Sequence, residues 1–76
     1  MDILINNKTI VHVNPIWTGT SVGYRMAYLS VDQKRSLGLP ARHAEYAVRI
    51  DGQRAELVKC VNGYTSTRGT AEILAD

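Results

Sequence analysis

The chain has 76 residues and a formal net charge of +2, from nine lysine and arginine residues against seven aspartate and glutamate residues. This length fits one small domain, 1–76, of a size that is usually only marginally stable without an oligomer or a bound partner. The single cysteine, Cys60, excludes an internal disulfide and every metal site built on several cysteines, and no apolar run approaches the roughly 20 residues that cross a bilayer.

Residues 2–13 have the pattern of a β-hairpin. Two β-branched runs flank a polar centre with two asparagines, which tolerate the positive φ that tight turns require. Two registers compete. A turn centred on the asparagine–lysine pair sets Ile5 opposite Ile10 and Leu4 opposite Val11, whereas a turn centred on the two asparagines leaves Leu4 against a threonine. We favour the first register, because it matches apolar residues on both faces.

Residues 14–23 form the longest irregular stretch, and they hold the only tryptophan, Trp17. Its side chain either pins the loop to the core or stands exposed as an anchor for a partner. A strand follows over 24–29. Tyr24, Met26 and Tyr28 share one face of it, which is either core or interface.

A short helix is predicted near residues 31–37, because this segment carries both a start and a stop signal. Ser30 and Gln33 form a capping box, in which each side chain bonds to the backbone amide of the other residue. Gly38 can close the helix in a left-handed conformation, and Pro40 blocks its continuation. A helix this short is unstable alone, so it must pack on a sheet. The residues available for that packing are Val31, Leu37 and Leu39.

Residues 45–61 predict a second hairpin, whose register follows from charge. A turn at Gly52-Gln53 places glycine where a type II′ turn needs it, and sets Asp51 opposite Arg54. A turn one residue earlier would instead place two arginines opposite each other. The register that we choose directs Tyr46, Val48, Ile50, Ala55 and Leu57 inward. It leaves Arg49, Asp51, Arg54 and Glu56 as an exposed ladder of ion pairs, which contributes little to stability.

The C-terminal part begins with Asn62-Gly63, a strong hairpin signal, after which 64–68 should return antiparallel. Residues 70–74 fit either a last edge strand or a helical turn. The whole pattern predicts a β-rich α+β domain of five or six short, mostly antiparallel strands with one short helix near 31–37.

Residue types that carry catalysis are present, but they form no motif. His12 and His43 are the only imidazole bases, and no Gly-x-Ser-x-Gly elbow or phosphate-binding glycine loop is present. We interpret Cys60 as a buried strand cysteine and His12 as a surface or hydrogen-bonded residue. We therefore expect a protein that is not an enzyme, with no cofactor and no metal.

The segment from Leu29 to Leu39, with its Leu37-Gly38-Leu39 run and a two-strand unit after it, resembles the second half of the AbrB/MazE-type swapped-hairpin DNA-binding domain. The resemblance covers residues 29–58. It departs from that family at Ser30, which replaces a proline, at Gln33, which occupies an apolar position, and at Arg42-His43, which stand where Gly-Asp is expected. The resemblance implies a dimer that binds DNA through basic residues near Arg25.

Basic residues gather in the middle third of the chain, opposed there only by Asp32 and Glu45. This cluster is either a solvated face or the footprint of nucleic acid or an acidic protein. If it is a footprint, an aromatic anchor with charged neighbours would carry the binding. On that basis the predicted partner-binding residues are Trp17, Arg25, Lys34, Arg35, Arg42 and His43.

Two functions from different classes follow. The one we favour is a binding protein that docks on and blocks a larger protein or nucleoprotein complex, with a profile similar to small phage or mobile-element inhibitors such as anti-CRISPRs. The alternative is a small dimeric AbrB-like DNA-binding transcriptional regulator, for which the net charge is low. We expect a cytoplasmic protein with no membrane partner, in the host cytoplasm if it is viral. The partner's identity and a homodimer stay open.

Overall fold

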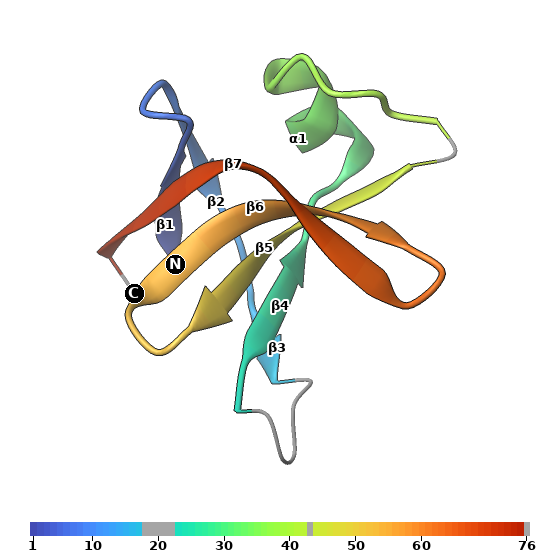
Figure 1. The fold of residues 1–76 in the computed structure, drawn as a ribbon. Helices are drawn as coiled ribbons and strands as arrows, with labels where there is room; N and C mark the ends of the chain where they lie inside the picture. Colours follow the sequence, from blue (N-terminus) through green and yellow to red (C-terminus); the bar gives the residue numbers. More distant parts are fainter. Residues whose placement is uncertain (18–22, 43, 76) are drawn as a thin grey trace.

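The computed structural model describes residues 1–17, 23–42 and 44–75, and Figure 1 shows them as a single curled sheet with one helix. The strands are β1 (Asp2–Ile5), β2 (Thr9–His12), β3 (Ile16–Trp17), β4 (Arg25–Tyr28), β5 (Glu45–Asp51), β6 (Arg54–Val61) and β7 (Tyr64–Ala75), and the helix is α1 (Val31–Ser36). All neighbouring strands are antiparallel, in the order β2-β1-β7-β6-β5-β4-β3. The predicted β-rich class with one short helix is confirmed. The described part holds seven strands rather than five or six, because the irregular stretch contributes β3.

The sheet curls because its two edge strands are consecutive in the chain. β2 and β3 lie at opposite edges, yet only residues 13–15 separate them. A flat sheet of seven strands would hold its edges roughly 29 Å apart, whereas this connection spans at most about 14 Å. The two edges must therefore approach each other. The sheet then has an inner face, which encloses the core, and an outer face.

The main core fills the inner face. Its buried side chains are Ile3, Ile5, Val11, Val13, Ala27, Leu29, Tyr46, Val48, Ile50 and Leu57. Leu37 and Leu39, which follow α1, pack against this core, so the segment after the helix closes one end of the curled sheet (Figure 1). Val31 does not take part, since 46% of it is exposed. Our prediction that Val31 packs on the sheet is therefore wrong.

The β1–β2 hairpin takes neither of the two registers that we weighed. Ile3 pairs with Val11 and Leu4 pairs with Ile10, around a loop of Asn6, Asn7 and Lys8 in which both asparagines have positive φ. This register puts Ile3 and Val11 together on the inner face and turns Leu4 and Ile10 outward. The prediction failed because it chose the register that pairs apolar residues on both faces of the hairpin. In the structure the core lies on one side only, and it fixes which of these apolar residues face inward.

The capping box of α1 is present as predicted. Ser30 Oγ accepts from the Gln33 amide at 3.2 Å, and the Ser30 amide donates to Gln33 Oε1 at 2.9 Å. Gln33 has a second role, because its side-chain amide donates to the His12 carbonyl oxygen at 2.8 Å. The helix start is thus tied to the edge strand β2.

The β5–β6 hairpin has the predicted register, with Asp51 opposite Arg54 and Arg49 opposite Glu56. Gly52 has a φ of 64°, and Gln53 is not among the residues with positive φ, as a type II′ turn requires. The side chains, however, form no ladder of ion pairs. Among the described residues, a hydrogen bond does join two ionisable side chains elsewhere, between His12 Nδ1 and Asp2 Oδ1 at 2.8 Å, on the surface of β1 and β2.

Gly52→Val should lower the free energy of unfolding by about 1 kcal/mol or more, because valine resists a positive φ. No atom lies within 4 Å of a Cβ built at this position, so the cost comes from the backbone and not from a collision. Denaturant unfolding measures it. An unchanged transition midpoint would contradict the type II′ turn.

β7 is a single strand that changes partner along its length. After the Asn62-Gly63 turn, the part from Tyr64 to Ala71 pairs with β6, and the part from Ala71 to Ala75 pairs with β1. Residues 70–74 are therefore strand, and β7 lies between β1 and β6 in the order of the sheet, so it is not an edge strand. At the change of partner, the Asn6 amide donates to the Thr70 carbonyl oxygen at 2.9 Å, and Asn6 Oδ1 accepts from the Thr70 amide at 3.0 Å.

Candidate functional site

The outer face of β4, β5 and β6 carries a second apolar cluster. Met26, Ala47 and Val58 are at most 4% exposed, although they lie on the side away from the main core, and Tyr24 and Cys60 pack against them. Antiparallel sheets usually alternate apolar residues toward the core with polar residues toward water. These central strands therefore bury apolar side chains on both faces.

Exposed apolar side chains extend this cluster to its margins. Ile16 in β3 pairs with Met26 and is 64% exposed, and Tyr28 pairs with Ala47 and is 52% exposed. We define the outer apolar face by its members: Ile16, Tyr24, Met26, Tyr28, Ala47, Val58 and Cys60. Tyr24, Met26 and Tyr28 are the trio that we had left open between core and interface. They belong to this face and not to the main core.

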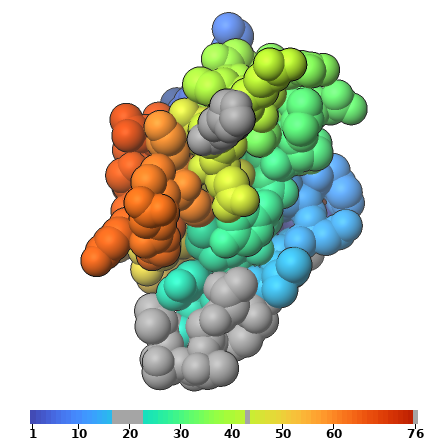
Figure 2. All heavy atoms as spheres, turned by 90° about the vertical axis from the view of Figure 1, so that its right-hand side faces the viewer, coloured from blue at the N-terminus to red at the C-terminus, as the bar shows by residue number. Residues whose placement is uncertain are grey.

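Figure 2 looks toward this side of the molecule. β4, in teal, lies between the blue residues of β3 and the orange β6–β7 hairpin, which projects beside it. The face is therefore bordered along one side by a protruding hairpin.

Charged side chains along the margins of this face are mixed in sign. The alternating positions of β5 and β6 place Glu45, Asp51 and Glu56 on the outer side, together with Arg49 and Arg54. The Arg49 guanidinium carbon lies 4.6 Å from the centre of the Tyr24 ring, a distance at which the cation and the ring attract each other. The Glu56 carboxylate accepts from the Thr67 hydroxyl at 3.0 Å. Three carboxylates against two guanidiniums do not favour a polyanion.

Two ionisable side chains of the face, Cys60 and Tyr28, have raised pKa values. Burial raises the pKa of the Cys60 thiol above its ordinary 9.0, and Glu45 adds to the effect. Burial also raises the pKa of Tyr28, followed by contributions from Cys60, Glu45 and Tyr24. Cys60 is therefore a protonated thiol at neutral pH. Our interpretation of Cys60 as a buried strand cysteine is correct for the strand but not for the burial, since Cys60 lies in β6 and is half-buried.

Alkylation of Cys60 by iodoacetamide should be slow at pH 7, because the thiolate is the reactive form and the pKa of this thiol is raised. Its rate should reach the inflection at a higher pH in the folded chain than in denaturant. The stability that the raised pKa of Cys60 contributes is fully present below the pKa of the unfolded chain and is lost as the pH rises through the pKa of the folded chain. An inflection of the folded chain at or below that of the unfolded chain would contradict this assignment.

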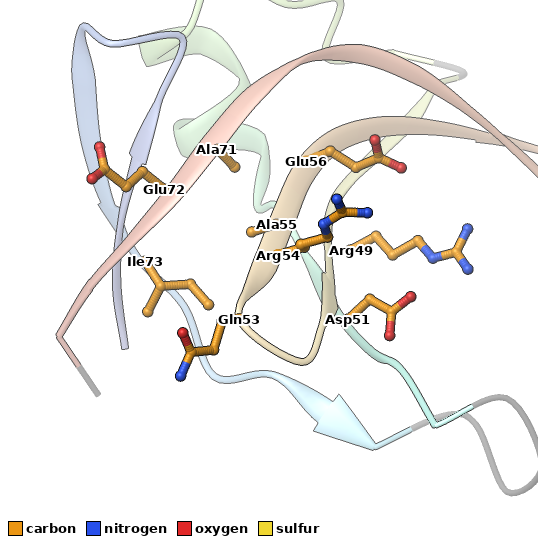
Figure 3. A pocket seen from close by; sticks show the side chains of 9 residues that line it. All are labelled: Arg49, Asp51, Gln53, Arg54, Ala55, Glu56, Ala71, Glu72 and Ile73. Carbon is orange, nitrogen blue, oxygen red and sulfur yellow. The ribbon is translucent and has the colours of Figure 1, made fainter.

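An open depression lies next to the outer apolar face, where β6 and β7 diverge (Figure 3). Arg49, Arg54 and Glu56 line one side of it and Glu72 and Ile73 the other. Figure 3 shows that the charged side chains of β5 and β6 extend away to one side, whereas Glu72 points in the other direction. The charged groups around the depression therefore do not converge on a common point.

The predicted basic cluster is divided by the fold. Arg25 pairs with Trp17 and Ile50 at one end of the strands, whereas Arg35 and Arg42 lie on α1 and the loop after it, at the other end (Figure 1). The side chain of Trp17 and the whole of His43 fall outside the described residues. Arg35 does share a surface with another cation. Arg35 and Lys8 both line an open hollow between the β1–β2 loop and the end of α1.

Lys34, another predicted contact, is only 8% exposed. Its ammonium group donates to the carbonyl oxygens of Ala44 at 3.1 Å and Ala41 at 3.4 Å. These bonds hold the loop after α1 against the helix. We therefore leave Lys34 out of the proposed contact surface.

The sequence contains a signal for the outer apolar face that we did not use. Ala47-Val48 and Leu57-Val58 are adjacent apolar pairs in neighbouring strands, and such pairs indicate a strand that is buried on both sides. We assigned only the inward member of each pair to a packed surface.

Comparison with known proteins found no family model, no curated protein and no solved structure that matches this chain. In the described ranges, no three histidine, cysteine, aspartate or glutamate side chains gather as metal ligands. No helix in the described part is long and apolar enough to cross a membrane.

Proposed function

We propose that this chain is a non-enzymatic binding protein, which docks through the outer apolar face on a larger protein or nucleoprotein partner and blocks it. The observation that carries the proposal is that β4, β5 and β6 bury apolar side chains on both faces while only the inner face lies on the main core. Ile16 and Tyr28 remain exposed on the other face. An apolar centre with charged groups at its margin is the anatomy of a protein interface.

Within this class we propose an inhibitor of host defence from a phage or mobile element, with a profile similar to anti-CRISPRs, acting in the host cytoplasm. The support for this narrower proposal is the candidate interface on a small β-rich fold. An inhibitor that acts by occupying a surface needs only a rigid face of the right shape.

The alternative is a small dimeric DNA-binding regulator of the AbrB type. The observation in its favour is the hollow that Lys8 and Arg35 share, because no carboxylate lines it. Phosphate contacts release counterions, so DNA binding there would weaken steeply with salt. The net charge of +2 and the carboxylates on the outer side of the sheet favour the protein partner.

A matched pair of substitutions tests the docking face. Ile16 and Ile10 are the same residue type and are 64% and 61% exposed, but only Ile16 belongs to the outer apolar face. We expect the tagged chain to capture one stoichiometric protein from a lysate of its natural host, Ile16→Asp to lose it, and Ile10→Asp to keep it. A buried charge at a protein interface costs several-fold to a hundred-fold in affinity, roughly 1–3 kcal/mol.

Capture that survives Ile16→Asp, or that Ile10→Asp abolishes equally, would overturn the docking face.

An electrophoretic mobility shift assay with random duplex DNA at low and moderate salt examines the alternative. A shift that fades with salt and is lost in Arg35→Glu would favour the regulator.

A further inference from the structure

The first half of β7 has an unpaired backbone edge. Residues 64–68 pair with β6 on one side, but the other neighbour, β1, reaches only as far as Ala71. Beyond Ala71, Asn6 makes two hydrogen bonds with the backbone of Thr70. The chain then turns away from β7 into the β1–β2 loop. Nothing in the described part of the chain pairs with the remaining five residues.

The two edge strands of the sheet, β2 and β3, are shorter than this edge, with four and two residues. Along β2, the Gln33 side chain already bonds to the His12 carbonyl oxygen. Unpaired edges are where strands from other chains add, and the edge of residues 64–68 carries no proline.

The hairpin turn shows which backbone groups point outward. Val61 and Tyr64 flank a two-residue turn, and the residues that flank such a turn bond to each other. Hydrogen-bonded and non-hydrogen-bonded pairs then alternate, so Thr65 and Thr67 direct their N–H and C=O groups away from β6. Both residues are exposed.

We propose that this edge binds a second copy of the chain, as an antiparallel β7–β7 pair with its two-fold axis at Ser66. In this register Thr65 lies opposite Thr67 of the second copy, and their outward backbone groups make four hydrogen bonds across the axis. A two-fold contact of this kind is self-complementary and closes after two copies.

Side-chain chemistry matches the same register. Tyr64, which is 79% exposed, comes to lie opposite Arg68 of the second copy. An arginine opposite a tyrosine is an attractive cross-strand pair. The same register keeps Arg68 of one copy away from Arg68 of the second copy. The β-bulge at Arg68, where β7 shifts register against β6, limits the flat stretch to these five residues.

The interface is small, and the association is accordingly weak. Five residues on each chain bury less than the roughly 1,000 Å² that stable interfaces need. We expect a dissociation constant on the order of 10 µM to 1 mM. The chain should then be monomeric at low micromolar concentration and increasingly dimeric toward millimolar concentration. A larger partner that holds two copies close together would strengthen the pair.

Sedimentation velocity over that range tests the proposal with three variants. Thr65→Pro removes an outward N–H and should abolish the concentration-dependent shift, while a proline at an edge position is tolerated by the fold. Tyr64→Arg should abolish it too, because two arginines then face each other. Tyr64→Glu should keep it, since the new carboxylate faces Arg68 of the second copy. The melting temperature of each variant confirms that it is folded.

The opposite responses of Tyr64→Arg and Tyr64→Glu distinguish this register from general adhesion of an exposed tyrosine. Equal loss in both variants, a dimer that survives Thr65→Pro, or no shift in the wild-type chain up to millimolar concentration would overturn the proposal. Ile16→Asp separates it from the docking function, because Ile16 is not on this edge. The dimer should persist in Ile16→Asp, and its loss there would place the contact on the outer apolar face instead.

Discussion

Val11→Asp should abolish cooperative folding, whereas Ile10→Asp should lower the free energy of unfolding by less than about 1 kcal/mol. Val11 is 5% exposed on the inner face, beside Ile3, and Ile10 is 61% exposed on the outer side. An unpaired carboxylate placed in an apolar core costs several kcal/mol, which is comparable to the whole stability of a small domain.

Circular dichroism during thermal unfolding measures both variants. The experiment also decides the register of the β1–β2 hairpin, because a shift of one residue exchanges the faces of the two positions. Equal effects at the two positions, or a larger loss at Ile10, would contradict the pairing of Ile3 with Val11.

Leu57→Ala should cost about 2–5 kcal/mol, because it removes methyl groups from a fully buried position and leaves a cavity. Leu57 is 0% exposed in the main core, and its neighbour Val58 is 1% exposed in the second cluster on the other side of β6. Val58→Ala should therefore also destabilise, by about 1–3 kcal/mol. Adjacent residues of one strand would then both behave as core.

A valine in the same strand provides the control. Val61 is 50% exposed, so Val61→Ala should change stability by less than about 0.5 kcal/mol. Unfolding in guanidinium chloride gives the free energy of unfolding of each of the three variants. The values can be compared directly when this free energy falls with denaturant concentration at the same slope in all three. If Val58→Ala were as mild as Val61→Ala, the outer cluster would not be packed, and the support for an interface built around it would fall.

The comparison of Val58 and Val61 also bears on the function. Both are outside the main core, but Val58 is covered by its neighbours and Val61 is not. A preformed, packed floor with exposed Ile16 and Tyr28 at its margins can bind without first becoming ordered, which reduces the entropic cost of association.

Local signals predicted the elements that depend on few residues. The capping box at Ser30 and Gln33 and the turns at Gly52 and at Asn62-Gly63 are present as expected. Each is decided by a φ value or a hydrogen bond within a few residues, so the sequence alone contains the cause. The β5–β6 register belongs here as well, since the turn and the opposite charges act together.

Longer-range features were missed or placed wrongly for a common reason. The β1–β2 register depends on which face meets the core, and the position of residues 70–74 in a strand that is not an edge depends on β1, which is far away in the chain. The basic cluster looked continuous because its members are close in sequence, yet antiparallel strands and α1 carry Arg25 and Arg35 to opposite ends.

The sequence by itself determined a small β-rich chain, its single helix and its tight turns, because local sterics and capping settle those features. Only the tertiary structure decided how the sheet closes and that its outer face also carries a packed apolar cluster. The short connection between β2 and β3 forces the two edges together, and the curl then encloses the main core on the inner side. Alternation along β5 and β6 already separated an inward side from a side with charged residues, but the packing of Met26, Ala47 and Val58 on that second side needs three neighbouring strands to bring them together.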